Sequence, residues 1–307
     1  MLNTMLMESE AQSNEKWTTR GLTRLDKLVG RTRSRLYRRY NRIKGLIVGT
    51  AHHNCIYAYW WDSIVNFGDL ITARLLESYG FTPIHCSPKR AQVVATGSVL
   101  ERIPEEYQGV IIGSGLIHGE SVRFFSRAKI LALRGELTRQ RLGAPEEIIL
   151  GDPGLLIARL SQDRQKKRFV LGLVPHYVDH RSSSIRQILK NNRKEVCLID
   201  PRRDPIKVVR DIDTCEFILS SSLHGLVCAD ALGIPSAWIL LSDRVIGSGF
   251  KFRDYYSALR MKKNPTVISG YESLSALIRQ TSLPDESVVC EVKTNLDEAF
   301  RTLSAMV

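Results

Sequence analysis

Short apolar runs, each followed by a Gly-rich or polar turn and then by a helical pattern, recur along the chain from residue 56 onward. This alternation is typical of βα units in a parallel sheet. Helices are predicted at 70–79 and 222–232, where apolar residues follow the helical period. The predicted strands are 56–61, 91–94, 109–112, 129–133 and 147–150 in a first half, and 169–174, 195–199, 216–219 and 237–241 in a second.

A polar, charged stretch without periodicity separates the two groups of strands. It covers residues 161–168 (SQDRQKKR) and is predicted to be a linker. The expected fold is therefore α/β, with two Rossmann-like domains at 44–163 and 164–307 that face each other across a cleft. Open α/β folds bind ligands at the carboxyl ends of their strands, so we expect the functional residues there.

The segment before the first strand has a different pattern. Between residues 17 and 43 apolar positions recur at helical spacing and arginines fill the other faces, which predicts a basic amphipathic helix within a segment at 1–43. Such a helix can lie on an anionic membrane surface, or pack on its own domain with a solvated basic face. Nucleic acid is not expected as a partner, because no known base-reading module accompanies the charge.

Composition adds limits to this picture. The 307 residues include 43% hydrophobic and 25% charged residues, the profile of a globular chain. The formal net charge is +12, and the segment 1–44 carries +7 of it, from eleven basic and four acidic residues. No apolar run approaches the length of a membrane span, and Met1–Glu10 lacks the order of a secretory signal. A cytoplasmic location is expected, at the inner membrane face if the basic helix binds lipid.

Asn66, Gly68 and Asp69 lie at a predicted strand-to-helix turn. Gly68 permits a tight turn or close approach of a ligand, and the free amides of a helix start favour an anion. Alternatively, Asp69 is simply a helix N-cap and Asn66 a turn residue. Gly113 and Ser114 follow another strand and resemble a phosphate-cradling turn, but they fit no nucleotide-binding pattern, so an ordinary turn is the alternative.

Arg134 ends the predicted strand 129–133 and would emerge at the cleft. Arginine presents a planar fork that matches a carboxylate or a phosphate. The alternative is a surface arginine that pairs with Glu136. His176, in the segment VPHYVD, follows the strand 169–174 and faces the cleft by the same argument.

The stretch 217–238, FILSSSLHGLVCADALGIPSAW, is the most informative one. Ser220, Ser221 and Ser222 join a strand to a helix, and His224 lies in the first helical turn. Serine hydroxyls, open amides and the positive end of the helix dipole together make an anion site with a titratable group inside it. A buried structural histidine is the alternative.

Two further cations, Lys251 and Arg253, follow a Gly-rich turn and are candidates for a loop that closes on an anion. A solvated loop is the alternative. His52, His53 and Cys55 lack a second ligand cluster, so no metal site is predicted.

The segments NFGD, RGELTRQRLG, LGDPGLL, GLVPHYVDH, SSSLHGLVCADALGIPSAW and FKFRDYY, in this order, resemble the polysaccharide pyruvyl transferase family over about residues 56–260. Members resemble two-domain GT-B glycosyltransferases in fold. They transfer the pyruvyl moiety of phosphoenolpyruvate to a sugar, usually as a cyclic ketal. The SSSLHG form resembles the branch that acts on exopolysaccharide repeat units.

The resemblance implies site residues and partners. Arg134 and His224 match family residues implicated with the donor, and Lys251 is the match for a downstream family lysine. Ser222 departs from the pattern, since many members have arginine there. In this chain Arg134, Lys251 or Arg253 would have to replace the contact that this arginine makes with a carboxylate or phosphate. The implied partners are phosphoenolpyruvate and a lipid-linked oligosaccharide, without a cofactor.

In the implied mechanism His224 is the candidate acid. The general base is left open among Asp69, Asp152 and Asp179. Two other functions are alternatives: a GT-B-type glycosyltransferase that uses a nucleotide sugar, and a non-catalytic glycan-binding scaffold.

Overall fold

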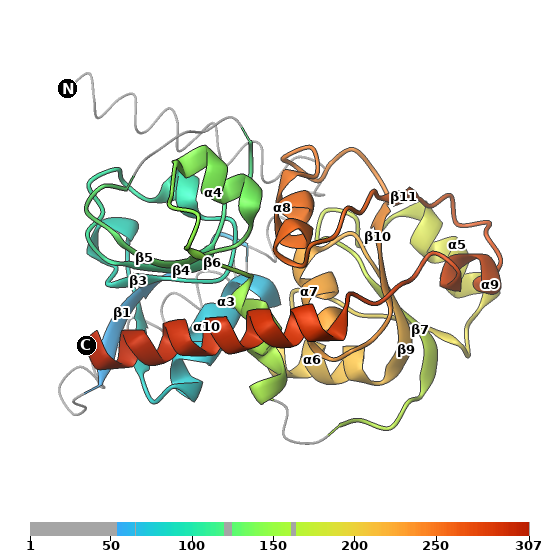
Figure 1. Ribbon diagram of the computed structural model, residues 1–307. Helices are drawn as coiled ribbons and strands as arrows, with labels where there is room; N and C mark the ends of the chain where they lie inside the picture. Colours follow the sequence, from blue (N-terminus) through green and yellow to red (C-terminus); the bar gives the residue numbers. More distant parts are fainter. Residues whose placement is uncertain (1–53, 65, 120–124, 161–163, 307) are drawn as a thin grey trace.

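The computed structural model describes residues 54–64, 66–119, 125–160 and 164–306. The predicted basic helix at 17–43, together with His52 and His53, lies outside the described residues. The described chain forms two sheets, each with all of its paired strands parallel, and they lie side by side in Figure 1. A mixed α/β fold with two parallel sheets is thus confirmed.

The first sheet has the strand order β2-β1-β3-β4-β5-β6, and the second has the order β8-β7-β9-β10-β11. The first sheet consists of β1 (Cys55–Tyr59), β2 (Thr82–His85), β3 (Val93–Val94), β4 (Val110–Ser114), β5 (Lys129–Leu133) and β6 (Ile149–Leu150). The second consists of β7 (Phe169–Val174), β8 (Val196–Leu198), β9 (Cys215–Ser220), β10 (Ser236–Leu240) and β11 (Thr266–Val267).

Both sheets are doubly wound in the same way, because the chain starts inside the sheet, adds one strand outward, and then continues in the opposite direction. The order reverses between β1 and β3 in the first sheet and between β7 and β9 in the second. Loops that leave the carboxyl ends of such a strand pair diverge to opposite faces of the sheet and leave a crevice between them. Each half therefore has one position where its topology favours a ligand.

Every strand predicted from the sequence overlaps an observed one, and 129–133 and 169–174 have the observed bounds. The short strands β2 and β11 were not predicted. The helices are α3 (Phe67–Ser78), α4 (Glu136–Leu142), α5 (Ser183–Asn191), α6 (Pro205–Asp213), α7 (Leu223–Ala231), α8 (Phe250–Ala258), α9 (Leu274–Ile278) and α10 (Glu286–Met306), with 3-10 turns η1 (Pro88–Arg90), η2 (Leu100–Arg102) and η3 (Pro153–Leu160).

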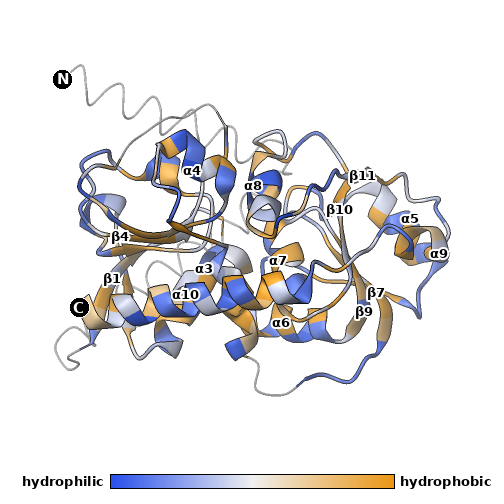
Figure 2. Ribbon diagram, in the orientation of Figure 1, coloured by the Kyte–Doolittle hydropathy of each residue, from blue (hydrophilic) through white to orange (hydrophobic). Residues whose placement is uncertain are grey.

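The last helix, α10, connects the two halves. Its buried residues repeat at helical spacing, from Val288 to Leu303, and alternate with hydrophilic ones in Figure 2. It packs on β4, β5, β6 and η3, and the ring of Phe300 stacks on Tyr79 with centroids 4.8 Å apart. The division at residue 163 stays a prediction, but part of the predicted second domain packs on the first sheet.

The main hydrophobic core is continuous across both halves. It includes Ile56 and Ile112 from the first sheet, Ile218 from the second, and the helices α3, α7 and α10 around them. Within the described residues, no helix has both the length and the apolar composition to span a membrane.

Candidate active site

A cavity lies where the two topological reversal points face each other. The loops after β1 and β3 form one wall, and the loops after β7 and β9, with the start of α8, form the other. The lining residues are Trp61, Asn66, Asp69, Ser98, Val99, Arg102 and Ile117 from the first half, and His176, Tyr177, Pro201, Ser222, Leu223, His224, Ile246 and Lys251 from the second.

The serines after β9 shape the turn into α7. The hydroxyl of Ser220 donates to the Val174 carbonyl (2.7 Å) and accepts from the Ser222 amide (3.0 Å), so it holds the turn against β7. Ser222 is then the N-cap residue, and its side chain makes no capping bond. Because first-turn amides have no intrahelical acceptor, those of Leu223 and His224 are available at the cavity wall.

His224 is buried, with 11% of its side chain exposed, and it lies at the cavity between the two halves. Its Nε2 atom is 3.6 Å from Oδ2 of the fully buried Asp152, and neither atom has a hydrogen-bond partner within the described structure. The other oxygen of Asp152 accepts the Gly154 amide at 2.8 Å. The Nδ1 edge of the ring lies against Gly68, where a side chain would not fit. A protonated His224 would therefore have a fixed anionic neighbour.

Asn66 and Asp69 form the start of α3 on the opposite wall. Asn66 caps the helix by accepting the Asp69 amide (3.2 Å), and its side-chain amide donates to the Asp69 carboxylate. Burial raises the pKa of Asp69 to about 6. This rise is limited by groups that lower the pKa, namely His224, the hydrogen bond from Asn66, Lys251 and Arg102. The carboxyl group can thus exchange a proton near neutral pH.

Two cations face this carboxyl group. Burial lowers the pKa of Lys251 to about 8, the positive charge of Arg134 lowers it as well, and Asp69 opposes them. Arg102 lies flat over the indole of Trp61, with its guanidinium carbon 3.6 Å from the ring centroid. Among the described residues, neither cation has an ion-pair partner. The cavity therefore holds positive charge that an anionic ligand can neutralise.

His176 is a second histidine in the cavity, but its environment differs. Burial, and then the charge of Lys251, lower its pKa well below the usual value of 6.5. Its backbone amide donates to Ser221 at 2.9 Å, and its ring lies against Tyr177 with centroids 4.2 Å apart. A neutral imidazole at this position can accept or donate a hydrogen bond without adding charge.

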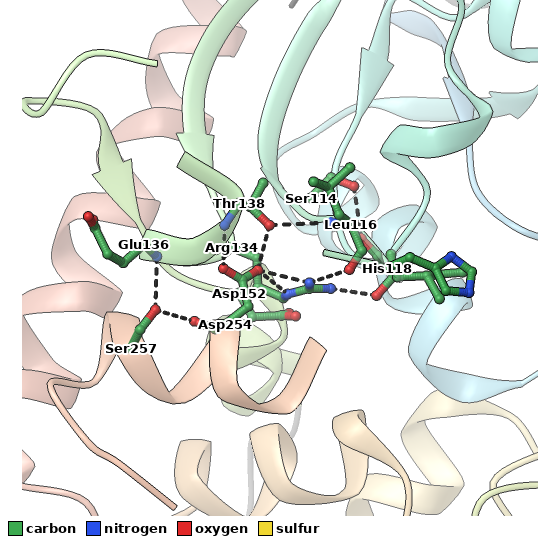
Figure 3. A network of polar contacts seen from close by, with 12 residues as sticks. Ser114, Leu116, His118, Arg134, Glu136, Thr138, Asp152, Asp254 and Ser257 are labelled. Atoms are coloured by element: carbon green, nitrogen blue, oxygen red, sulfur yellow. Dashed lines mark hydrogen bonds and ion pairs between the residues drawn. The ribbon is translucent and has the colours of Figure 1, made fainter. Parts of the chain in front are cut away.

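Arg134 does not line the cavity. Its side chain is completely buried, and hydrogen bonds hold it on three sides (Figure 3). Its Nε donates to Asp254 (2.8 Å), one terminal nitrogen to the Ser98 hydroxyl (2.5 Å) and the other to the Leu116 carbonyl (2.6 Å). The strand-end position was as expected, but the partner is Asp254 of α8 rather than Glu136, which pairs with Arg139.

Several other predicted residues have structural roles outside the lining. Gly113 adopts a φ of +71° and packs on Pro153, and the hydroxyl of Ser114 donates to the Gly97 carbonyl at 2.8 Å. Arg253 is exposed and donates to the Ser248 carbonyl. Asp179 is buried in an ion pair with Arg244 at 3.1 Å. The predicted residues that do line the cavity are Asn66, Asp69, His176, Ser222, His224 and Lys251.

The sequence alone did not single out Trp61, Arg102 and Tyr177. Trp61 ends the predicted strand 56–61, and Tyr177 follows His176 after the strand 169–174, so the strand-end argument that selected His176 applies to them too. Arg102 lies in the short turn η2, eight residues after β3, where no motif marks it. Among the described residues, no group of three or more His, Cys, Asp and Glu side chains could hold a metal ion.

This cavity lies at the carboxyl ends of two doubly wound sheets, where open α/β folds bind their ligands. Comparison with known proteins gives the family. A model of the polysaccharide pyruvyl transferase family matches residues 66–243, and the chain belongs to that family. The family resemblance seen in the sequence is thus confirmed, and with it the enzyme class of pyruvyl transferases.

Two relatives are similar over most of the chain. The succinoglycan biosynthesis protein ExoV of Rhizobium meliloti (strain 1021) is 29% identical over 231 residues, which are 72% of this chain and 70% of the relative. The uncharacterized protein L143 of Acanthamoeba polyphaga mimivirus is 28% identical over 244 residues, 73% of this chain and 83% of the relative. A solved α1,3-fucosyltransferase matches 80% of this chain and 90% of its own at 12% identity, with a TM-score of 0.21, too low to inform the fold.

Proposed function

We propose that the protein transfers the pyruvyl group of phosphoenolpyruvate to a sugar of a lipid-linked bacterial oligosaccharide, forms a pyruvate ketal and releases phosphate. The observation that carries the proposal is a pair of cations, Lys251 and Arg102, which have no ion-pair partner within the described parts of the chain and line the same cavity as His224. Family membership supports the transferred group, and the name of ExoV supports an exopolysaccharide acceptor.

The donor has a phosphate and a carboxylate, close to three negative charges. Lys251 and Arg102 neutralise them, and the first amides of α7 with the Ser222 hydroxyl add hydrogen bonds. Ser222 stands where many family members have arginine. Arg102, which comes from the opposite wall, supplies the guanidinium in this chain.

In the proposed reaction protonated His224 gives a proton to the methylene carbon of the donor, which becomes the methyl group. Asp152, near Nε2, stabilises the imidazolium. The central carbon is then an oxocarbenium-like electrophile. One sugar hydroxyl attacks it and loses its proton to a base. A second hydroxyl then displaces the phosphate, so that the C–O bond to phosphate breaks and the ketal closes. The proton of this hydroxyl passes to the departing phosphate, which leaves as hydrogen phosphate, and the proton held by the base returns to His224 through solvent.

Asp69 is the base of this scheme. It lines the cavity, whereas Asp152 supports His224 and Asp179 is held by Arg244 outside the lining. A pKa of about 6 allows Asp69 to be ionised at neutral pH and still to accept a proton readily. The scheme uses no cofactor.

The acceptor sugar occupies the rest of the cavity. The rings of Trp61 and Tyr177 provide apolar faces of the kind on which a sugar can stack, and Ile117 and Ile246 extend them. In this proposal the two halves form a GT-B-like pair in the cytoplasm, and residues 17–43 hold the cavity near a lipid-linked acceptor at the inner membrane face.

The experiment is incubation of the protein with phosphoenolpyruvate and succinoglycan-type oligosaccharides, with phosphate release and product mass measured together. We expect equal amounts of phosphate and ketal, and at least a tenfold loss for His224→Ala, about 1.4 kcal/mol of barrier. Transfer from a nucleotide sugar would instead identify a glycosyltransferase. Oligosaccharide binding without turnover of either donor would identify a scaffold.

A further inference from the structure

Helix α8 is attached to both halves of the molecule. Toward the second half, the hydroxyl of Tyr255 donates to the buried carboxylate of Asp230 at 2.8 Å. Toward the first half, the carboxylate of Asp254 enters a pocket at the start of α4. There it accepts Nε of Arg134 (2.8 Å) and both the amide (2.7 Å) and the hydroxyl (2.6 Å) of Thr138.

Glycines allow this close contact. A Cβ atom on Gly135 would collide with the backbone carbonyl of Asp254, and one on Gly115 would collide with the guanidinium of Arg134. Gly119 likewise lies against the ring of Phe250, at the first position of α8. The arginine, glycine and threonine of the segment RGELT therefore all serve to hold one carboxylate of α8.

The guanidinium of Arg134 has no free edge for a ligand. Each of its three nitrogens has a hydrogen-bond partner, and the side chain is completely buried (Figure 3). Lys251, by contrast, reaches the cavity without a hydrogen-bond or ion-pair partner among the described residues. It lies one helical turn before Asp254, so both side chains project from the same face of α8.

We infer that the buried Arg134–Asp254 ion pair is a positioning device, which fixes the Lys251 ammonium group in the cavity through helix α8. Arg134 therefore acts on the substrate through Lys251 and not by contact. This inference rests on the proposed function for the identity of the anion that Lys251 binds. The pair also links α8 to the first half of the molecule, so the side of the cavity that carries Lys251 is already in place before the ligand binds.

The first test is a double-mutant cycle on the affinity for phosphoenolpyruvate, measured by calorimetry with Arg134→Gln, Asp254→Asn and the double variant. Positioning predicts at least a tenfold loss for each single variant and no greater loss for the double variant, because all three break the same link. If Asp254→Asn kept the affinity of the unaltered protein while Arg134→Gln lost it, Arg134 would contact the donor directly and the inference would be wrong.

Single variants leave one buried charge unpaired, and they can unfold. The double variant removes both charges and keeps amide groups at both positions. If it folds, as measured by thermal unfolding, and retains the full affinity, the inference is also overturned. Arg139→Gln is the matched control. Its side chain hydrogen-bonds to Glu136 and to the Ala144 carbonyl, both outside α8, so its loss should not change the affinity.

The second test needs no substrate. The rate at which an amine reagent labels Lys251 is followed against pH by mass spectrometry. Because the charge of Arg134 lowers the pKa of Lys251, the labelling midpoint should rise in Arg134→Gln. It should fall or stay in Asp254→Asn, where Arg134 keeps an uncompensated charge. Midpoints unchanged in both would contradict the inference. Failure of the unaltered protein to bind phosphoenolpyruvate would remove the proposed function but leave this result intact.

Discussion

Gly68 at the start of α3 packs directly on the imidazole of His224 at the start of α7, so the two walls of the cavity meet at a residue without a side chain. A Cβ atom at position 68 would overlap Nδ1 and Cγ of the histidine. The sequence alone suggested that Gly68 approaches a ligand. In the structure it approaches His224, and it sets how far that ring can turn toward α3.

Gly68→Ala should therefore move His224 and reduce turnover. We expect at least a tenfold fall in kcat and a loss of about 1–3 kcal/mol in the free energy of unfolding, since the added methyl group overpacks a filled site. Gly172→Ala is the control. Its Cβ would press on Ile218 and Cys215 inside the second sheet, far from the lining, and should cost stability with little change in kcat. Equal kcat losses in both would contradict a specific contact with His224.

The carboxyl group of Asp69 should produce an acid limb in the pH profile. With a pKa of about 6 in the free protein, kcat/KM should fall as the pH drops through 6, because a protonated Asp69 cannot accept the hydroxyl proton. Asp69→Asn should lower activity at all pH values, and any residual activity should lack this limb. A limb that persists in the variant would assign the base to another group.

The raised pKa of Asp69 also makes the stability of the folded protein depend on pH, and here the loss comes as the pH rises. Folding favours the protonated form of Asp69, so its stabilising contribution is complete below the usual pKa of 3.8 and is lost as the pH rises through about 6. Asp69→Asn should therefore stabilise the protein above pH 7, by up to about 3 kcal/mol, and leave it nearly unchanged below pH 4. Denaturant unfolding at both pH values measures this. Glu77→Gln, on the surface of the same helix, should show no such gain.

Arg102 should carry part of the donor affinity. We expect Arg102→Ala to weaken phosphoenolpyruvate binding at least tenfold, because the cavity loses one of its two unpaired cations. Arg90→Ala is a matched control, since Arg90 also lies over an aromatic ring, that of Tyr57 at 5.7 Å, but outside the cavity. Similar losses in both variants would show a general charge effect rather than a site contact.

Lys251 should set the alkaline limit of activity. Its pKa is lowered to about 8 in the free protein, so kcat/KM should fall as the pH rises through 8 and the ammonium group loses its charge. A guanidinium stays charged in this range, so Lys251→Arg should retain part of the activity and lose the alkaline limb. An unchanged limb in the variant would exclude Lys251 as its origin.

Asp152 should support the charged form of His224. In Asp152→Asn the carboxylate near Nε2 is replaced by a neutral amide, so the protonated imidazole that gives its proton to the donor loses its anionic neighbour. Turnover should fall at least tenfold. A His224 that remains neutral at pH 7 with donor bound to the unaltered protein would require a different acid.

The sequence predicted the strands well where an apolar run was long enough to be recognised. It missed β2 and β11 because the first contains Pro83 and the second has only two residues. The position of His176 followed from the strand-end argument, that of Asp69 from the predicted strand-to-helix turn, and that of Lys251 from the Gly-rich turn before it. The local pattern could not show contacts between residues that are far apart in the sequence. Asp254 lies 120 residues after Arg134, and α10 crosses back to the first sheet. For the same reason Arg134 was expected to face the ligand directly.

The most direct test is a crystal structure of the protein with phosphoenolpyruvate bound. We predict the phosphate and carboxylate within hydrogen-bond distance of Lys251 and Arg102, the methylene carbon toward the imidazole of His224, and Arg134 still paired with Asp254. A donor bound outside this cavity, or held with its methylene carbon away from His224, would contradict it.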